Sequence, residues 1–320
     1  MLDGRGVAAR GRGVNMCGMT RTYALAILLA AGTLAAVAAQ PAEPKVVDVE
    51  KLADNLFILK GGGGNTAVFV TGAGVTVVDT KIPGWGRPII DKVKELTSKP
   101  ITTIINTHTH YDHVSGNVEF PATVDVVVQE NTKAGMERMG PVLGRESVTS
   151  GPSIFKENGG RGLPKRTFKD RLTLGKGADQ IDLYYFGRGH TNGDAFVVFP
   201  ALRVMHAGDI FARKGPPLLD ANNGGSGVAI GDTLAKAHAG IKGVDRVITG
   251  HSDVMTWADL DEYTRFNKDF LAWVTAAMKS GKTADAAAAE YVIPAAYKGY
   301  TPNADQTKSN VAVIYKELAK

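Results

Sequence analysis

The sequence predicts a layered α/β domain, and three observations lead to this prediction. Strand-like and helix-like segments alternate from Asn55 onward, which is typical of α/β architectures. Several of the strand-like segments are apolar almost throughout, as strands buried on both faces are. No internal repeat or low-complexity linker interrupts the alternation. We therefore expect a single domain over residues 55–320, with helices at its C-terminal end.

The domain is expected to begin with successive hairpins. The runs "NLFIL" (55–59) and "NTAVFV" (65–70) flank the glycine turn 61–64, and "VTVVDT" (75–80) follows another glycine-rich turn. A phosphate-binding loop is the other interpretation of residues 61–64. We favour a hairpin turn, because no helix and no Lys-Ser/Thr pair follows the glycines.

Later segments continue the alternation. Apolar residues at helical spacing from Ile89 to Leu96 predict a helix that ends before Pro100. The predicted strands are "ITTIINT" (101–107), "VDVVVQE" (124–130), "IDLYYFG" (181–187), "DAFVVFP" (194–200), "LRVMHAG" (202–208) and "VDRVITG" (244–250). Further helices are predicted over 232–241, around Tyr263 to Val274, in the alanine run 284–289 and over 311–318. The basic stretch 159–171 is expected to be a solvated loop.

The N-terminus is typical of an export signal. Arginines precede the apolar run "YALAILLAAGTLAAVAA", and Ala36-Val37-Ala38 gives the small-x-small cleavage pattern. We predict a signal peptide over residues 1–38, a lead-in over 39–54, and a periplasmic or secreted protein without a stable membrane span. An uncleaved anchor is the alternative, and a translation start at Met16 or Met19 stays open.

Charge and cysteine content narrow the function. The net charge is +5, and removal of residues 1–38 takes away four Arg and one Asp, which leaves +5 minus +3, or +2. This modest charge argues against a nucleic-acid partner, so we expect a small-molecule substrate. The only cysteine, Cys17, lies in the predicted signal. Any metal in the mature protein is therefore expected to bind nitrogen and oxygen atoms.

A cluster of metal-binding side chains follows the predicted strand 101–107. His108, His110, Asp112 and His113 stand close together in a chain that has only 7 histidines. They are expected on a loop at the C-terminal end of a strand, where open α/β sheets place ligand sites. Imidazole and carboxylate suit zinc. A polar surface loop is the alternative, but such a density of histidines makes it the weaker interpretation.

More ligands are expected from elsewhere in the chain, because one loop cannot complete two metal shells. Three candidates each follow an apolar strand beside a glycine. They are His190 in "GRGHTNGD", Asp209 in "MHAGD" and His251 in "VITGH". Each alone is an ordinary turn residue, whereas their joint occurrence after the histidine cluster indicates a site.

These motifs, in this order, resemble those of the metallo-beta-lactamase superfamily. The pattern is H-x-H-x-D-H, then G-H-T, G-D and G-H, and "VVDT" adds an acidic residue, Asp79, after an early strand. The resemblance covers about Asn55 to His251 and is specific for the fold rather than for the substrate. It implies an αββα sandwich with a binuclear zinc site on one edge.

The resemblance also implies a role for each residue. His108, His110 and His190 would bind one zinc, and Asp112, His113 and His251 the other, with Asp209 bridging the two ions. A metal-bound hydroxide is the expected nucleophile. Asp112 would orient this nucleophile or relay its proton, and Asp79 would fix a ligand imidazole.

Departures from the branches of the superfamily narrow the expected chemistry. His110 favours zinc hydrolysis over the di-iron redox branch, which carries a glutamate there, and the lack of a later cysteine excludes the beta-lactamases that bind zinc through one. With an aspartate at position 209, the sequence is more similar to glyoxalase II and lactonases. The residues Arg213 and Lys214 are out of register with the lysine that holds the substrate carboxylate in some beta-lactamases.

We therefore expect an exported di-zinc hydrolase of a carbonyl, with β-lactams as the leading substrate class. A lactone, ester or thioester is the alternative, and a zinc-binding protein without turnover is the remote one. Tyr111 is expected to pack rather than to act in catalysis, and His206 and His238 to be structural or exposed. The sequence leaves the oligomeric state open.

Overall fold

The computed structural model describes Lys45, residues 47–138 and residues 153–320. Residues 45–320 form one compact unit. The predicted signal peptide lies outside the described residues. Among the residues that are described, no helix is both long and apolar enough to span a membrane.

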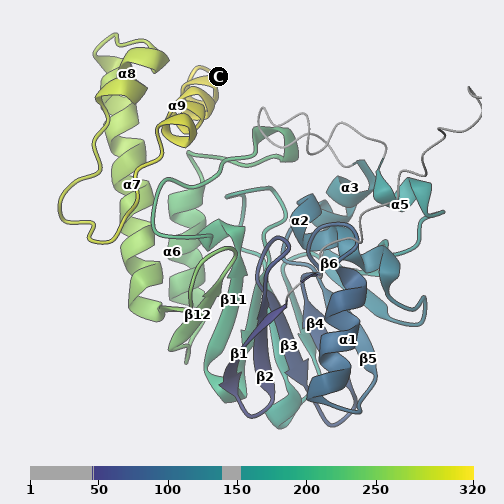
Figure 1. Cartoon of the computed structure of the whole chain (residues 1–320). Helices are drawn as coiled ribbons and strands as arrows, with labels where there is room; N and C mark the ends of the chain where they lie inside the picture. The colour runs from purple at the N-terminus through teal and green to yellow at the C-terminus, as the bar shows by residue number, and fades with distance from the viewer. Residues whose placement is uncertain (1–44, 46, 139–152) are drawn as a thin grey trace, which may run out of the picture. The chain divides into compact units, whose positions relative to one another are not determined.

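Two mixed β-sheets form the centre of this unit (Figure 1). The first sheet has the strand order β1-β2-β3-β4-β5-β6-β7 and contains β1 (Asp48–Ala53), β2 (Leu56–Lys60), β3 (Thr66–Val70), β4 (Val75–Val78), β5 (Ile101–Ile105), β6 (Asp125–Gln129) and β7 (Arg166–Phe168). The second sheet has the order β13-β12-β11-β10-β9-β8 and contains β8 (Arg171–Leu174), β9 (Ile181–Tyr184), β10 (Phe196–Phe199), β11 (Val204–Gly208), β12 (Arg246–Thr249) and β13 (Met255–Thr256).

Helices cover the outer face of each sheet (Figure 1). The first sheet is covered by α1 (Gly86–Leu96), α2 (Tyr111–Val114), α3 (Glu130–Arg138) and α5 (Ile154–Glu157). Beside the second sheet lie α6 (Ile230–Gly240), α7 (Trp257–Lys279), α8 (Ala284–Glu290) and α9 (Ala304–Leu318). The order of layers is therefore helix, sheet, sheet, helix, as the αββα prediction required.

Three apolar cores hold the layers together. The middle core lies between the sheets, where Phe69 of the first sheet meets Phe199 of the second at a ring-centroid distance of 5.0 Å. A second core joins the first sheet to α1, and a third joins the second sheet to α6 and α7. Because inner strands contact apolar cores on both faces, their runs are nearly continuous in apolar residues.

The helix α7 shows how local sequence determines an element. The Thr256 side chain accepts the backbone N–H of Asp259, and the Asp259 side chain accepts the backbone N–H of Thr256 in return. This capping box satisfies donors that have no partner within the helix. Tyr263, Phe266 and Phe270 lie on one buried face, as their spacing predicted.

Two segments differ from the sequence-based expectations. Residues 48–53, taken as part of a lead-in, form the edge strand β1, which is largely exposed and therefore lacks the apolar signature of a buried strand. The basic stretch 159–171 was expected to be a loop throughout, but Arg166–Phe168 form β7, and β8 begins at Arg171. The strands β1 and β7 are the two edges of the first sheet, and β8 is an edge of the second; charged side chains are common at such edges.

Strand direction determines which loops meet at one edge. In the first sheet β4 pairs with β5 in parallel, and in the second β11 pairs with β12 in parallel. The loops after these four strands therefore leave from the carboxyl ends of parallel neighbours. The candidate ligands follow β5, β9, β11 and β12, and Asp79 follows β4.

Candidate metal centre

The structure brings seven predicted ligands into two groups. In each group, one nitrogen or oxygen atom per residue lies within 4.8 Å of the others. The first group is His108, His110, His190 and Asp209, and the second is Asp112, His113 and His251. For the six other residues the grouping has the division that the resemblance implies, whereas the resemblance places Asp209 between the two groups. That these residues bind metal remains a prediction.

Strand ends and one short helix position these side chains. His108 and His110 follow β5, Asp209 follows β11, and His251 follows β12. The cluster was expected to be entirely loop, whereas Asp112 and His113 lie on the single-turn helix α2, which begins just after His110. Because of this turn, Asp112 and His113 reach the second group, while His108 and His110 face the first.

In the first group, hydrogen bonds determine which imidazole nitrogens are free. His190 Nδ1 lies 2.6 Å from the carbonyl oxygen of Leu218, to which it donates. His110 Nε2 lies 2.7 Å from Asp220 Oδ2 and donates to that carboxylate. Both outer nitrogens therefore carry the proton, and the unprotonated inner nitrogens, His110 Nδ1 and His190 Nε2, face each other at 2.9 Å. Two lone pairs at this distance repel unless a cation lies beside them.

His108 adds a third inward lone pair. Its Nδ1 lies 3.0 Å from Thr107 Oγ1, and that hydroxyl donates its own proton to Asp79 Oδ2 at 2.7 Å. His108 must therefore donate from Nδ1, which leaves Nε2 without a proton. The Nε2 atom is buried and has no hydrogen-bond partner, and the same is true of Asp209 Oδ1. Unpaired buried acceptors are costly, and a metal ion at this place would satisfy them.

The second group has the same construction. His113 Nδ1 lies 2.7 Å from Asp79 Oδ2, so His113 Nε2 faces inward. This nitrogen lies 3.2 Å from His251 Nε2 and 3.3 Å from Asp209 Oδ1. Asp112 Oδ2 lies 3.3 Å from His251 Nε2. The geometry therefore gathers two imidazoles and two carboxylates around one point.

Carboxylates make the second group attractive to positive charge. Asp209 raises the pKa of His251 to about 9, although burial opposes this shift. Burial lowers the pKa of His113, but the carboxylates of Asp209, Asp112 and Asp79 outweigh it and raise that pKa well above its ordinary value. A cation is therefore stabilised here, whether it is a proton or a metal ion.

In the first group, burial favours the neutral form of His108 and His190. Burial, followed by neighbouring imidazoles, lowers the pKa of His108 well below its ordinary value. Burial and then His110 lower the pKa of His190. Neutral imidazole is the form that binds metal, so His108 and His190 need little proton release to become ligands.

The family model described as the metallo-beta-lactamase superfamily matches residues 59–257, which is more than half of the 320 residues. The chain belongs to the metallo-beta-lactamase superfamily. Its αββα fold and the resemblance found in the sequence are thereby confirmed.

Relatives within the superfamily carry different names. A hydroxyacylglutathione hydrolase of Trichodesmium erythraeum is 29% identical over 129 residues, which are 40% of this chain and 41% of that protein. A metallo-beta-lactamase type 2 of Elizabethkingia meningoseptica is 27% identical over 204 residues, which are 60% of this chain and 73% of that protein. The chain spans 41% and 52% of the two hydroxyacylglutathione hydrolases that it matches.

A solved structure shows the same fold. A metallo-beta-lactamase from Pontibacter korlensis superposes with a TM-score of 0.57 at 17% sequence identity, covering 70% of this chain and 99% of that chain. At this identity the likeness concerns the fold alone.

Two glycines let the candidate ligands pack closely against the backbone. A Cβ on Gly250 would lie 1.8 Å from Asp209 Oδ1, and a Cβ on Gly64 would lie 2.2 Å from His113 Cε1. Neither position can take a side chain without a shift of the ligand. The turn 61–64 was predicted only as a hairpin connection, and the structure adds that it packs against the candidate ligands.

Two acidic residues each hold the imidazole of a candidate ligand on the side away from the other ligands. Asp79 has a φ of 63° and accepts Thr107 N–H at 2.8 Å in addition to its bond to His113, which agrees with the predicted supporting role. Asp220 does the same for His110, but the sequence analysis did not identify it. No motif marks Asp220, because its contact is made through the fold by a loop far from His110 in sequence.

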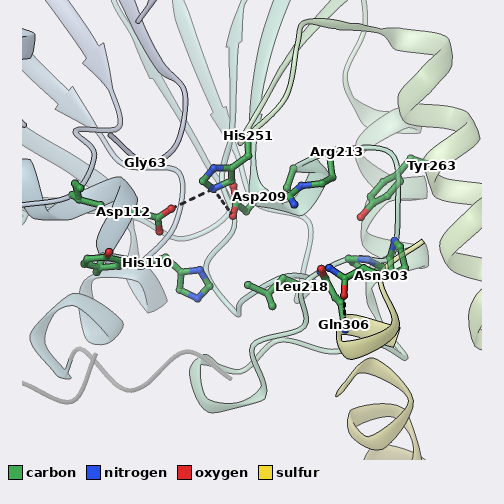
Figure 2. A pocket seen from close by; sticks show the side chains of 15 residues that line it. Gly63, His110, Asp112, Asp209, Arg213, Leu218, His251, Tyr263, Asn303 and Gln306 are labelled. Atoms are coloured by element: carbon green, nitrogen blue, oxygen red, sulfur yellow. Dashed lines mark hydrogen bonds and ion pairs between the residues drawn. The ribbon is translucent and has the colours of Figure 1, made fainter. Parts of the chain in front are cut away.

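A pocket of about 460 Å³ opens in front of both groups. Figure 2 shows His110 and Asp112 on one side of it and Arg213 and Gln306 on the other, with Leu218 between them. Its lining thus combines predicted ligands with residues of the 212–218 loop and of α9. The helix α9 lies beyond the 59–257 match, so this part of the wall is particular to the C-terminal segment.

The remaining predicted residues have defined surroundings. Tyr111 is half-buried and lines the pocket, so it can contact a substrate, although it was expected only to pack. His206 is buried, with Nε2 3.1 Å from the carbonyl oxygen of Asn65, and has a structural role as expected. His238 stacks on Trp257 at 4.8 Å between ring centroids and does not line the pocket.

Proposed function

We propose that this protein is a di-zinc hydrolase that attacks a carbonyl carbon, with β-lactams as the leading substrate class and a lactone, ester or thioester as the alternative. The observation that carries the proposal is the position of Asp209. Its Oδ2 lies 3.2 Å from His251 Nε2 and 3.8 Å from His190 Nε2, so one carboxylate reaches both groups. A shared anion offsets the repulsion between two nearby cations.

The donor atoms suit zinc. Both groups offer imidazole nitrogen and carboxylate oxygen, and the inward lone pair of His108 Nε2 has no other partner. Zinc held by such residues would lower the pKa of a bound water to about 7 and would polarise a substrate carbonyl. Asp79 and Asp220 then keep the ligand imidazoles in the tautomers that binding requires.

Asp112 is the residue placed to handle a proton. Its side chain is 23% exposed and lines the pocket, so it is open to substrate and water. Burial raises the pKa of Asp112, but His113 and His251 outweigh burial and bring the pKa to about 2. The carboxylate is therefore ionised at neutral pH. A carboxylate with so low a pKa is a weak base, so it is suited to orienting a nucleophilic water and relaying the proton onward rather than keeping it.

The pocket supports a small substrate that carries negative charge. Its volume of about 460 Å³ is in the range of small-molecule sites. Arg213 lines the wall opposite Asp112, whereas the neighbouring Lys214 is held by Asp259 at 2.6 Å and by Glu262 at 3.0 Å. β-Lactams of the penicillin and cephalosporin type carry a carboxylate, which favours them as the first class to test.

The shared carboxylate keeps the alternative in view. Asp209 is the feature by which the sequence resembles glyoxalase II and lactonases, and two matched relatives are named hydroxyacylglutathione hydrolase. Thioesters and lactones therefore form the second substrate group. Export to the periplasm or medium is part of the proposal and is supported by residues 1–38. N-terminal sequencing of the mature protein tests it.

The decisive experiment is a substrate panel on protein of measured zinc content. We expect two equivalents of zinc, and turnover of a chromogenic β-lactam, a lactone or a thioester that a chelator abolishes and zinc restores. His251→Ala should reduce the zinc content towards one equivalent. Protein with two zinc ions that turns over no member of the panel would refute the hydrolase proposal and favour a zinc-binding protein without turnover.

A further inference from the structure

A fully buried lysine lies beside the candidate metal centre. Lys81 is 0% exposed and is among the largest side chains that the fold buries completely. It follows β4 and has a φ of 69°, a backbone conformation that residues other than glycine seldom adopt. Lysine is almost never fully buried unless its charge is paired. Such a position therefore calls for an explanation.

The ammonium group joins the two sides of one hairpin loop. Lys81 Nζ donates to the carbonyl oxygen of Leu59 at 2.9 Å and to that of Gly64 at 2.7 Å. Leu59 lies in β2, and Gly64 precedes β3. The lysine therefore connects the two ends of the glycine turn 61–64. The main chain adds a further bond, in which Ile82 N–H donates to the Gly62 carbonyl at 3.0 Å.

The same loop presses on two candidate ligands of the second group. Gly64 N–H donates to the carbonyl oxygen of Asp112 at 3.1 Å. A Cβ on Gly63 would lie 2.6 Å from that oxygen, and a Cβ on Gly64 would lie 2.2 Å from the ring of His113. Figure 2 shows Gly63 beside Asp112 at the pocket. A shift of the loop must therefore displace these ligands.

The backbone around Lys81 holds the other side of the ligand segment. Gly116 N–H donates to the Lys81 carbonyl at 3.2 Å, and Thr80 N–H donates to the His113 carbonyl at 2.7 Å. Residues 80–82 thus connect the glycine loop to α2, which carries Asp112 and His113. The Lys81 side chain bonds to the turn 61–64 at Gly64, and this turn has no regular secondary structure to hold it in place.

Stability alone gives a weak reason for a charged group here. Desolvation of an ammonium is costly, and burial lowers the pKa of Lys81 to about 7, although Asp79 and Asp112 oppose the shift. An apolar side chain with a water or a neutral donor would satisfy two carbonyl oxygens at smaller cost. The Lys81 side chain instead bonds to the carbonyl oxygens of both Leu59 and Gly64, and so it fixes the position of the loop relative to the candidate ligands.

We propose that Lys81 is a positioning residue, which holds the Gly63–Gly64 backbone against Asp112 and His113 and thereby fixes the ligand set for the second zinc ion. The inference rests on the proposed di-zinc function. It concerns ligand geometry, so it can be tested by metal binding even if the substrate remains unknown.

The test compares Lys81→Met and Lys81→Gln with the parent protein by titration with Co²⁺, whose visible absorption reports ligand geometry. In Lys81→Met we expect parental affinity for the first equivalent, at least tenfold weaker binding of the second, and an altered spectrum for it. With a substrate from the panel, kcat should fall while KM changes less than about twofold. Lys81→Gln keeps a two-hydrogen donor without charge and should restore part of the second-ion affinity.

Two further variants keep the outcome readable. Asp182→Asn removes a polar contact between β8 and β9, so it is destabilising without touching the ligands and should bind both ions as the parent does. If Lys81→Met does not fold, Gly64→Ala is tested in its place. It displaces the same loop from its other side and should also weaken binding of the second ion. Folded Lys81→Met with parental second-ion affinity and spectrum would overturn the proposal. A parent that binds two ions but hydrolyses nothing would refute the hydrolase function alone.

Discussion

The carboxylate of Asp220 lies 2.7 Å from Nε2 of His110, and both side chains are buried. Asp220 also accepts the backbone N–H groups of Asn222 and Asn223 at 3.0 and 3.2 Å, which fixes the carboxylate at the start of a short 3-10 helix. It therefore acts as a rigid support that holds the His110 ring with Nδ1 directed at His190.

Asp220→Asn should weaken binding of the first zinc ion. The amide cannot replace the negative charge behind His110, and loss of such a support typically costs 10- to 100-fold in metal affinity. Competition with a chromophoric chelator measures both binding steps. We expect the first step to weaken and the second to change by less than about threefold. An unchanged first step would show that the ring orientation does not depend on Asp220.

Asp79→Asn should show the opposite pattern. Asparagine tolerates the positive φ of 63° at this position, so the backbone should be retained while the charge behind His113 is lost. We expect the second zinc ion to bind about 10- to 100-fold more weakly. The same chelator titration measures it, and equal weakening of both ions would contradict the division into two groups. The bonds of Asp79 to Thr107 and, through it, to His108 make a small effect on the first ion acceptable.

The fold was predicted from the sequence more completely than the residues that support the candidate ligands. Strands such as β3 and β11 have apolar runs that show their burial on both faces, and Asp209 and His251 lie just beyond the ends of β11 and β12. Asp220 and Lys81 gave no such signal. Each acts through a contact between loops that only the folded chain brings together, and neither stands in a short motif.

Edges and turns were harder to predict for a related reason. The strand β1 and the strand β7 have exposed, charged positions, so their sequences do not differ from those of solvated loops. The turn 61–64 was recognised through its glycines, but glycine has several uses. Its close approach to His113 depends on where α2 lies, which spacing along the chain does not reveal.

Arg213→Ala should weaken the binding of substrates that carry a negative charge. Arg213 is exposed at the pocket wall, and we expect KM for an anionic β-lactam to rise about tenfold through loss of a charge-assisted hydrogen bond. Turnover of an uncharged ester or lactone should be nearly unaffected. Lys214→Ala is the matched control, because Lys214 is already paired with Asp259 and Glu262. Equal effects of both variants would indicate a general field effect rather than contact with the substrate.

Asp182→Asn should lower the free energy of unfolding in a pH-dependent way. Burial raises the pKa of Asp182, but hydrogen bonds from Thr173, Gln180 and Arg171 outweigh it and leave the pKa below the ordinary value of 3.8. A carboxyl group whose pKa is lowered in the folded state stabilises the fold above its unfolded pKa, and this contribution is lost as the pH falls through the folded value.

At pH 7 we expect Asp182→Asn to cost about 1 kcal/mol, because Arg171 is largely exposed and its share is screened by solvent. The difference from the parent should shrink below about pH 4, where the parental carboxyl also becomes protonated. Urea unfolding of both proteins from pH 7 to pH 3 measures this difference. Acid release of metal affects the two proteins alike, so it leaves the comparison intact. A cost that stays constant down to pH 3 would mean that the substitution acts through packing and not through the charge of Asp182.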